Sequence, residues 1–456
     1  MSTAPTAPGV TKSGSVEALP IWRNFTWIFL GTVIYGICQW GIIVAIAKLG
    51  ASWQVGQYAL ALAITAPVML LANLQLRQVL ATDARSAFHF GDYLSLRLLT
   101  SAGALSVIGV LIVVLGLSSD GRIVVFLVAT AKAIDSLSDI FFGWLQSTER
   151  MHAIGLSMGV NGCISLLASI LVMYLTHSVV AVGVASAVGS SAGFLVALSG
   201  YSSSRRLREL AGIAKSSRLL DITGPLWSLA RLSLPLGAVM FLISLNANVP
   251  RYFIQRDLGA GQLGVYAAVG YVLIVGMTLI TSVGQAAIPR LAKYYASGDK
   301  TAFLKLVRLL LVLGCLLALA AILLVEIAGR DLVLLLYGRE YAGNLEFFRL
   351  LTLAAGLGFI GSFIGYAVTA ARYFLAQAPL YAAAVGVTAV GCALLLPRYG
   401  LTGAGWVAVG SAALMLAGGA AILVVALRTM EKGLPAMRRH RSSTLSEGLQ
   451  GTGSAR

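Results

Sequence analysis

Residues 309–325 read LLLVLGCLLALAAILLV, a run without a charged side chain. A helix of about 20 mostly apolar residues crosses the hydrocarbon layer of a membrane, so this stretch predicts a transmembrane helix. Similar runs recur along almost the whole chain, which has 456 residues, 58% of them hydrophobic and 11% charged. Because soluble domains have about 25% charged residues, the composition excludes a soluble globular enzyme, a disordered chain and a disulfide scaffold.

The apolar runs predict an all-α integral membrane protein with about twelve transmembrane helices. The predicted spans are 25–47, 56–76, 96–117, 122–146, 153–176, 179–200, 232–254, 264–286, 304–326, 346–371, 377–396 and 402–427.

An internal repeat divides these spans into two halves of six. Residues 49–59 read LGASWQVGQYA and residues 258–267 read LGAGQLGVYA, so both contain LGA followed by Gln, Gly and Tyr-Ala with one residue of slippage. Repeats of six spans keep the same orientation and are related by an axis along the membrane normal. The repeat therefore predicts two pseudo-symmetric six-helix lobes around a central cleft, an architecture typical of transporters.

The basic residues predict the orientation of these lobes. The two tails and the even-numbered loops hold 24 Lys and Arg, the odd-numbered loops hold 8, and the net charge of the chain is +16. Since basic loops stay in the cytosol, both termini are expected there. The predicted organisation is a disordered cytosolic tail at 1–22, a lobe at 23–200, a basic cytosolic linker at 201–231, a second lobe at 232–428 and a basic cytosolic tail at 429–456.

Three ionisable residues lie within the fourth predicted span. Asp135 and Asp139 follow Lys132 by 3 and 7 positions, which places all three on one helix face. Charges at membrane depth face a cavity or a partner. Lys132 and Asp135 can form a neutral pair that joins helices, or the face can line a cavity for a coupling cation or an anionic substrate group. Asp139 has no basic partner on this helix, so we predict Asp139, then Asp135, as ion-coupling residues for H⁺ or Na⁺.

Polar residues in other spans extend the predicted cavity lining. With the repeat offset of 209, Asn248 falls on Gln39, since 39 + 209 = 248. We predict a substrate-contacting surface formed by Lys132, Gln39, Asn248, Asn246, Arg251 and Asn161. The amides can equally join helices within the lobes, and Arg251 can extend to the membrane surface.

The sequence offers little support for catalysis. Four cysteines lie singly in apolar runs, four histidines are scattered, and no GxxxxGK[ST] loop is present. We therefore predict a protein that is not an enzyme and has no metal or organic cofactor. An ion gradient or the membrane potential would supply any energy.

Several groups of residues, in order along about residues 22–428, resemble signatures of the polysaccharide-transport (oligosaccharide flippase) family. They are Trp40, Ala47–Gly50, Gly56–Ala59 and Pro67; Ser136–Asp139, Gly143, Gln146, Glu149–Met151 and Ser157; Asn246–Tyr252, Leu258–Gly259 and Gly264–Tyr266; Leu334–Gly338 and Glu340–Tyr341; and Pro397–Ala404.

This resemblance implies the fold of the superfamily of flippases and multidrug extruders, in a bacterial cytoplasmic (inner) membrane. It implies that an oligosaccharide on a polyprenyl pyrophosphate is moved to the outer leaflet by alternating access, for capsule, exopolysaccharide or O-antigen synthesis. Expected partners are the lipid-linked glycan, the bilayer, and a glycan polymerase or glycosyltransferases, but no nucleic acid. One departure is Asn161, where the family would have a basic residue in helix 5. Lys132 or Arg251 would then supply the missing positive charge, or the substrate would carry a more neutral glycan.

Two alternatives stay open. A cation-coupled small-molecule extruder of the same superfamily would need an acidic cleft, and Lys132 and Arg251 count mildly against it. A membrane glycan polymerase or ligase would carry a large extracytoplasmic loop, which the predicted spans leave no room for.

Overall fold

The computed structural model describes residues 21–83, 88–202 and 224–450. The predictions for most of the tail 1–22, for the greater part of the linker 201–231 and for residues 451–456 lie outside the described residues. In the described part the chain is all helical, as predicted. Helices are the expected form here because each backbone N–H and C=O group finds its partner within the helix and none is left to the lipid.

The N-terminal half forms seven helices, which are α1 (Ile21–Leu49), α2 (Ser52–Asn73), α3 (Leu76–Thr82), α4 (Phe90–Val114), α5 (Ser119–Ser147), α6 (Met151–Thr176) and α7 (Val179–Ser202). The C-terminal half follows with α9 (Gly224–Asp257), α10 (Gly259–Ala296), α11 (Lys300–Leu336), η2 (Arg339–Tyr341), α12 (Leu345–Ala370), η3 (Phe374–Gln377) and α13 (Ala378–Gln450).

Each predicted span coincides largely with one of these helices, but 96–117 extends past Val114 and 56–76 crosses the break between α2 and α3. The number twelve stays a prediction. Among the described residues, nine helices are long and apolar enough to cross a membrane, or up to ten if the two parts of α10, bent by 44°, count as one span. The helix α5, which carries Lys132, Asp135 and Asp139, is not among the nine. The last two predicted spans form one element, α13, which is interrupted by non-helical torsion angles at Gly400.

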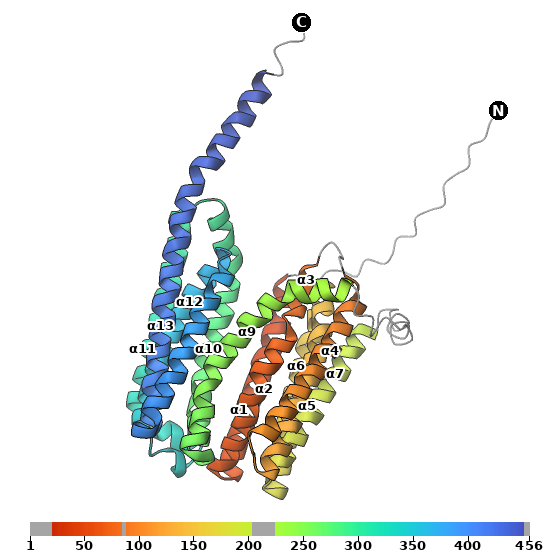
Figure 1. Ribbon diagram of the computed structural model, residues 1–456, viewed down its shortest axis with the longest axis vertical. Helices are drawn as coiled ribbons and strands as arrows, with labels where there is room; N and C mark the ends of the chain where they lie inside the picture. The colour runs from red at the N-terminus through yellow and green to blue at the C-terminus, as the bar shows by residue number, and fades with distance from the viewer. Residues whose placement is uncertain (1–20, 84–87, 203–223, 451–456) are drawn as a thin grey trace, which may run out of the picture.

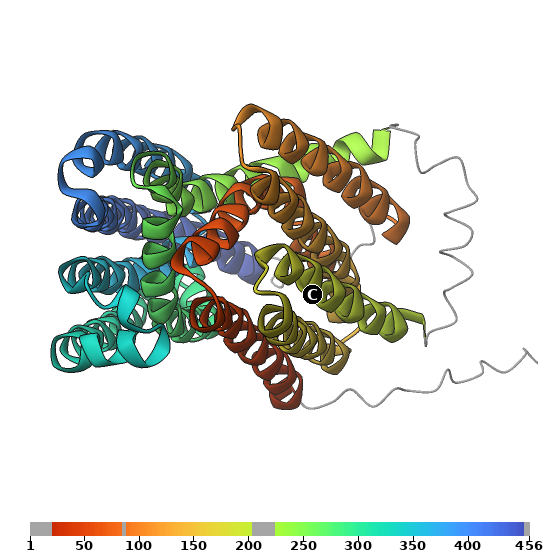
Figure 2. The same cartoon turned by 90° about the horizontal axis from the view of Figure 1, so that it is seen from below.

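The helices form two lobes that lie side by side (Figure 1). Helices α1–α7 form one lobe and α10–α13 the other, and the view from below separates the same two groups (Figure 2). Helix α9 belongs to both, since it contacts α2 and α4 of the first lobe and α13 of the second. Helix α1 begins and α13 leaves the bundle at the same end, where α3 also lies (Figure 1). We call this the terminal end and the other the far end.

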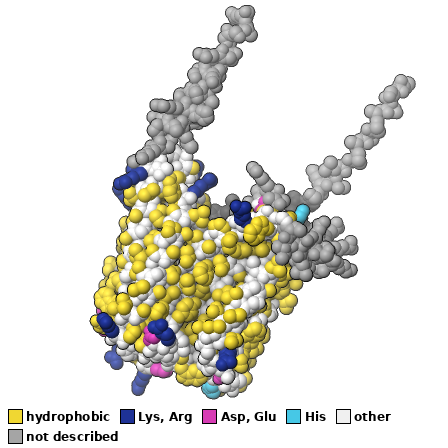
Figure 3. Space-filling view, viewed as in Figure 1, with side chains coloured by type: hydrophobic (Ala, Val, Ile, Leu, Met, Phe, Trp, Pro, Cys, Tyr) yellow, Lys and Arg dark blue, Asp and Glu magenta, His cyan; other side chains and the backbone are white. Residues whose placement is uncertain are grey.

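A hydrophobic surface surrounds the bundle. Yellow apolar side chains cover its middle, and the Lys and Arg side chains gather near the two ends (Figure 3). Large apolar side chains point outward, among them Val113 at 74% and Ile327 at 82% exposure. Soluble monomers rarely expose a continuous apolar surface of this kind, so the bundle is a multi-pass membrane protein with its apolar surface against lipid.

The lobes are packed together at the far end. One core cluster there combines residues of the first lobe, such as Ile46 and Val55, with residues of the second, such as Leu263, Val333 and Phe347. Toward the terminal end each lobe has its own clusters, for example around Phe363 in the second lobe and Tyr201 in the first. The lobes therefore share a core at one end only.

Candidate functional site

A cavity of about 900 Å³ opens between the lobes toward the terminal end. Its walls come from α1, α2, α3, α5 and α6 of the first lobe and from α10 of the second. The ionisable residues that line it are Arg77, Lys132, Asp135 and Asp139, all from the first lobe. The second lobe contributes Met277, Thr278, Thr281, Ser282 and Gln285. A smaller chamber of about 180 Å³ adjoins it and shares Arg77, Asp135 and Asp139.

The second helix is broken where it borders this cavity. Leu74 and Gln75 adopt left-handed backbone torsion angles, with φ of 49° and 52°. Helix α2 ends at Asn73, and the short α3 starts at Leu76 in a new direction. The predicted span 56–76 therefore ends early, and Asn73, Gln75, Arg77 and Gln78 border the cavity around the break.

Lys132 and Asp135 form the ion pair that their spacing allowed. The Lys132 ammonium lies 3.0 Å from the Asp135 carboxylate and donates to the Tyr35 hydroxyl at 3.3 Å. Asn161 donates its side-chain N–H to the other Asp135 oxygen at 2.9 Å. Asn161, predicted as a cavity residue, borders the smaller chamber. The distances are those of an ion pair that joins helices. Both side chains are nevertheless partly exposed, 29% for Lys132 and 21% for Asp135, and both face the cavity.

Asp139 is not a lone acid, because two arginines from other helices reach it. Arg77 lies 3.4 Å from one carboxylate oxygen and Arg97 of α4 lies 3.3 Å from the other. The Arg97 side chain is fully buried. It also donates to the side-chain oxygen of Asn73 and to the Ser136 hydroxyl at 3.1 Å. A buried arginine needs such partners, because an unpaired charge in a low-dielectric interior is very costly.

Four other predicted residues line none of these chambers. Asn246 accepts hydrogen bonds from Thr388 and Ser411 inside the second lobe, and Asn248 donates to the Ser244 carbonyl one turn back. Arg251 donates to Asn248 at 3.0 Å. Gln39 borders neither chamber. The expectation that these four residues line the cavity is not met in this conformation, since Asn246 bonds α13 and both Asn248 and Arg251 bond within α9.

Arg77 and Arg97 are the site residues that sequence reasoning missed. Both stand close to predicted span ends and were counted as basic residues of a cytosolic loop. Helix α4 begins at Phe90, six residues before the predicted start at 96, so Arg97 lies two turns inside it. The available signal was Asp139 itself, because a membrane acid without a partner on its own helix requires a basic partner from another.

At the far end the two copies of the sequence repeat pack against each other. A Cβ atom on Gly56 would collide with the backbone of Ala260, and one on Gly264 would collide with the backbone of Ser52. Once the one-residue slippage is allowed for, equivalent positions of the two repeats lie 208 residues apart, so Gly264 corresponds to Gly56 and Ala260 to Ser52. The contact is therefore reciprocal, because each glycine touches the residue equivalent to the one that the other glycine touches. We call this crossing of α2 and α10 the glycine seam. It closes the far end as tightly as two helix backbones allow.

Two side-chain hydrogen bonds reinforce the glycine seam. The Trp40 indole donates to the Tyr337 hydroxyl at 2.9 Å, and the Ser52 hydroxyl donates to the Glu340 carboxylate. Burial raises the pKa of Tyr337 to about 12, so its hydroxyl keeps its proton at neutral pH. Both bonds join the first lobe to the segment that follows α11.

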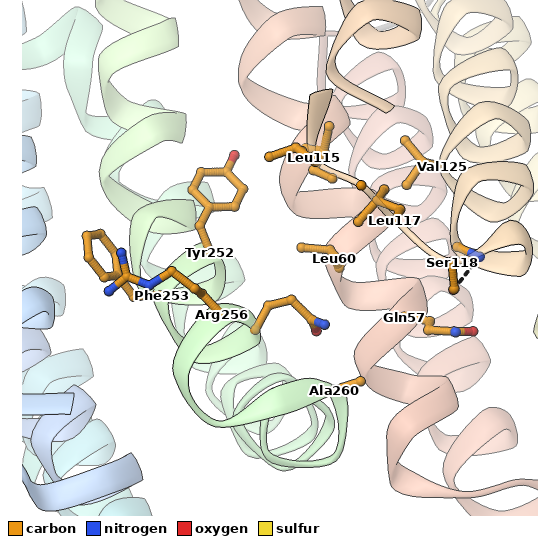
Figure 4. Close-up of a pocket in the computed structure, with 14 residues that line it drawn as sticks. Gln57, Leu60, Leu115, Leu117, Ser118, Val125, Tyr252, Phe253, Arg256 and Ala260 are labelled. Atoms are coloured by element: carbon orange, nitrogen blue, oxygen red, sulfur yellow. Dashed lines mark hydrogen bonds between the residues drawn. The ribbon is translucent and has the colours of Figure 1, made fainter. Parts of the chain in front are cut away.

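A third cavity, of about 650 Å³, is lined by residues of α2, the α4–α5 connection, α5 and α9, and by Ala260 of the glycine seam. Its walls are mainly apolar, with Leu60, Leu115 and Leu117 among the residues that line it (Figure 4). The Arg256 guanidinium at its edge is paired with Asp257 at 2.6 Å. This cavity has no connected charge network like that around Asp139.

Comparisons with known proteins agree with this architecture. Residues 21–295 match the family described as "Polysaccharide biosynthesis protein". The chain is 27% identical over 387 residues to the capsular polysaccharide biosynthesis protein CapF of Staphylococcus aureus, a match that covers 84% of this chain and 94% of CapF.

Solved structures share the fold at low sequence identity. An inward-facing multidrug resistance MATE family transporter of the MOP superfamily has a TM-score of 0.61 and 14% identity, over 93% of this chain and 97% of that one. A MOP superfamily transporter from Pyrococcus furiosus, described as having a binding pocket of reverse polarity, has a TM-score of 0.61 and 14% identity, over 90% and 95%. Both are similar to this chain in fold alone.

Proposed function

The chain belongs to the polysaccharide biosynthesis protein family, and from this premise we propose that it moves polyprenyl-pyrophosphate-linked oligosaccharides across the bacterial cytoplasmic membrane. A multi-pass membrane protein with a transporter fold, in a family concerned with polysaccharide synthesis, suits a substrate that is made on one side of a membrane and used on the other. The glycan would serve capsule, exopolysaccharide or O-antigen synthesis.

The charge of the cavity is the observation that carries this proposal. Arg77, Arg97 and Lys132 are opposed by Asp135 and Asp139, so the cavity and the side chains directly behind it have one positive charge in excess. A pyrophosphate head group cannot cross hydrocarbon unaided, because unpaired buried charge is prohibitive. A polar cavity with excess positive charge meets that requirement, whereas an extruder of cationic drugs would favour an acidic one.

Alternating access accounts for the asymmetry between the two ends. The cavity opens at the terminal end while the glycine seam closes the far end. With both termini in the cytosol, as the basic residues suggest, this conformation would receive the substrate from the inside. Rocking of the lobes would then open the seam toward the outer leaflet. The polyprenyl chain would remain in lipid throughout.

Coupling to H⁺ or Na⁺ is proposed at the two acids of α5. Asp139 already bonds two guanidinium groups, so a cation arriving there must displace an arginine. Asp135 has a single cationic partner, Lys132, so fewer positive charges oppose a cation there. The order of preference expected from sequence is accordingly reversed, with Asp135 first.

Reconstitution into vesicles with a fluorescent lipid-linked oligosaccharide tests the function. The protein should make the label accessible to a reagent on the opposite side of the membrane, and Lys132→Ala should reduce the rate. Export of cationic dyes without movement of the glycan lipid would instead establish the extruder alternative and would refute this proposal.

A further inference from the structure

The helix break beside the cavity is a strained feature of the backbone. Leu74 and Gln75 are adjacent, neither is glycine, and both have positive φ. Side chains with a Cβ atom rarely adopt this conformation, and it persists only where the surrounding structure enforces it. Such strain concentrates at ligand-binding sites. The break therefore calls for a functional explanation rather than a purely structural one.

Neighbouring helices hold this break through two glycines. A Cβ atom on Gly143 of α5 would lie 3.1 Å from the Arg77 carbonyl oxygen and 3.2 Å from its Cα. A Cβ atom on Gly237 of α9 would lie 3.0 Å from the Leu71 carbonyl oxygen. Close backbone approach on both sides thus fixes the course of the chain from α2 into α3. The break is built into the packing of three helices.

The break places Arg77 at the cavity wall, where its partners lie at long hydrogen-bonding distances. Its side chain is 26% exposed and lies 3.4 Å from Asp139. Its Nε donates to Gln146 at 3.4 Å, and its guanidinium carbon lies 5.4 Å from the centre of the Phe142 ring. Hydrogen bonds between ionised groups are normally about 2.7–2.9 Å long. Arg97 lies at a similar distance from the same acid, 3.3 Å, but is fully buried. What distinguishes Arg77 is therefore its exposure to the cavity, which lets it turn toward a ligand.

The charges around Asp139 identify Arg77 as the excess cation. If Arg77 leaves Asp139, the buried Arg97 still neutralises that carboxylate at 3.3 Å. Lys132 and Asp135 neutralise each other at 3.0 Å. Two balanced pairs then remain, and Arg77 is left with a full positive charge at the cavity wall. Its planar guanidinium can bind two phosphate oxygens side by side.

We propose that Arg77 binds the phosphate of an anionic ligand and that Asp139 is the resident anion it leaves on binding. Asp139 would hold the position of the phosphate until a ligand binds, and it neutralises Arg77 at the cavity wall. Arg97 retains Asp139 when the exchange takes place. This inference rests on the proposed function and assigns its phosphate-binding residue.

Binding measurements on purified protein in detergent test this exchange, with polyprenyl pyrophosphate as the probe. Arg77→Ala should weaken binding by about tenfold or more, as expected for the loss of charge-assisted hydrogen bonds. Asp139→Asn should tighten binding several-fold, because the competing carboxylate is gone. In an Arg77→Ala background Asp139→Asn should have no effect. Asp135→Asn is the matched control, and its effect should be the same with and without Arg77.

If Asp139→Asn does not fold, a second variant that changes no charge still tests the inference. Gly143→Val should displace the backbone of Arg77 and weaken binding as Arg77→Ala does, in a protein that stays folded but has a somewhat lower melting temperature, because the contact is overpacked. Normal binding by Arg77→Ala, or weaker binding by a folded Asp139→Asn, would overturn the inference and leave the proposed function standing. Failure of the unaltered protein to bind the probe would overturn both.

Two further probes separate the sources of phosphate. Inorganic pyrophosphate and phosphatidylglycerol each present phosphate oxygens without the polyprenyl chain. If phosphatidylglycerol binds as tightly as the probe and depends equally on Arg77, the exchange is supported but the ligand is a phospholipid head group. In that case the proposed function loses its support while the inference holds.

Discussion

Arg97 shows how much a single buried residue organises at this site. Its side chain is fully buried, and it bonds Asn73 of α2 and both Ser136 and Asp139 of α5. Lysine cannot replace such an arrangement, because it lacks the forked donor geometry of the guanidinium group.

Arg97→Ala should therefore destabilise the protein strongly, since it removes the buried donor that Asp139, Asn73 and Ser136 share. Removing one member of a buried ion pair costs about 3–5 kcal/mol. The melting temperature of the purified protein should fall sharply, and Arg97→Lys should recover little of it. Arg77→Ala, at the exposed side of the same acid, should change it far less. Equal effects of the two alanine variants would contradict this account.

Asp135 is the residue at which ion coupling can be tested most directly. Asp135→Asn should remove the dependence of glycan transport on an imposed pH gradient or Na⁺ gradient, because an amide neither takes up a proton nor supplies a charge to a cation. Transport should be measured in vesicles with each gradient imposed separately. A variant that still responds to both gradients as the unaltered protein does would refute the coupling role.

At the level of single residues, sequence reasoning located the charged face but not its partners. Spacing along one helix placed Lys132, Asp135 and Asp139 together, since helical periodicity is a local property. The contact of Asp139 with Arg77 and Arg97 depends on where α3 and α4 lie, which the local pattern does not encode. For the same reason the amides of α9 were assigned to a cavity, although Asn246 bonds Thr388 and Ser411 in α13.

Among the helices, the crossing of α2 and α10 decides which end of the molecule is open. Gly56 and Gly264 allow the two backbones to touch. Larger side chains at these positions should separate the helices at the far end, because overpacking a tight contact costs about 1–3 kcal/mol. That cost falls only on the conformation in which the seam is closed.

Gly56→Leu or Gly264→Leu should thus shift the protein toward a conformation open at the far end. In a background without the native cysteines, Val55→Cys, which is buried in the unaltered protein, should become more reactive toward a membrane-impermeant maleimide. Gly36→Leu is a suitable control, because its Cβ would meet no atom within 4 Å. Unchanged labelling of Val55→Cys in both seam variants would show that the glycines do not control closure.

The helices themselves were predictable and their interruptions were not. Long apolar runs fix where a chain lies in the membrane, so most of each predicted range is helical. The break at Leu74 and Gln75 has no local signal, because neither residue favours positive φ. It is enforced from outside by the close approach of α5 and α9.

For the whole molecule, transport requires that the lobes separate at the far end. Ser52 and Glu340 join the lobes there by a direct hydrogen bond. Ser52→Cys with Glu340→Cys, bridged by a short reversible thiol cross-linker, should stop transport, and a reductant should restore it. Glu326 and Arg349 lie 2.6 Å apart within the second lobe, so the same bridge between Glu326→Cys and Arg349→Cys should leave transport unaffected. Undiminished transport by the bridged Ser52–Glu340 pair would rule out rocking of the lobes.

The two-lobe architecture was predictable from the repeat, whereas the conformation was not. Duplication of LGA, Gln, Gly and Tyr-Ala indicates two related halves. Which end is closed depends on small differences in free energy between alternative conformations of the same sequence. The architecture and the conformation are nevertheless connected, because the motif that reveals the duplication also closes the far end. It does so through the reciprocal contacts of Gly56 with Ala260 and of Gly264 with Ser52.

That reciprocity has a consequence for the ancestry of the chain. A surface that meets a copy of itself through a two-fold axis is the signature of a symmetric homodimer. Before the gene doubled, a single six-helix polypeptide carrying this motif would have paired with its twin through the same contact. If the halves arose in this way they have since diverged, because Arg77, Lys132, Asp135 and Asp139, the ionisable residues that line the cavity, all lie in the first half.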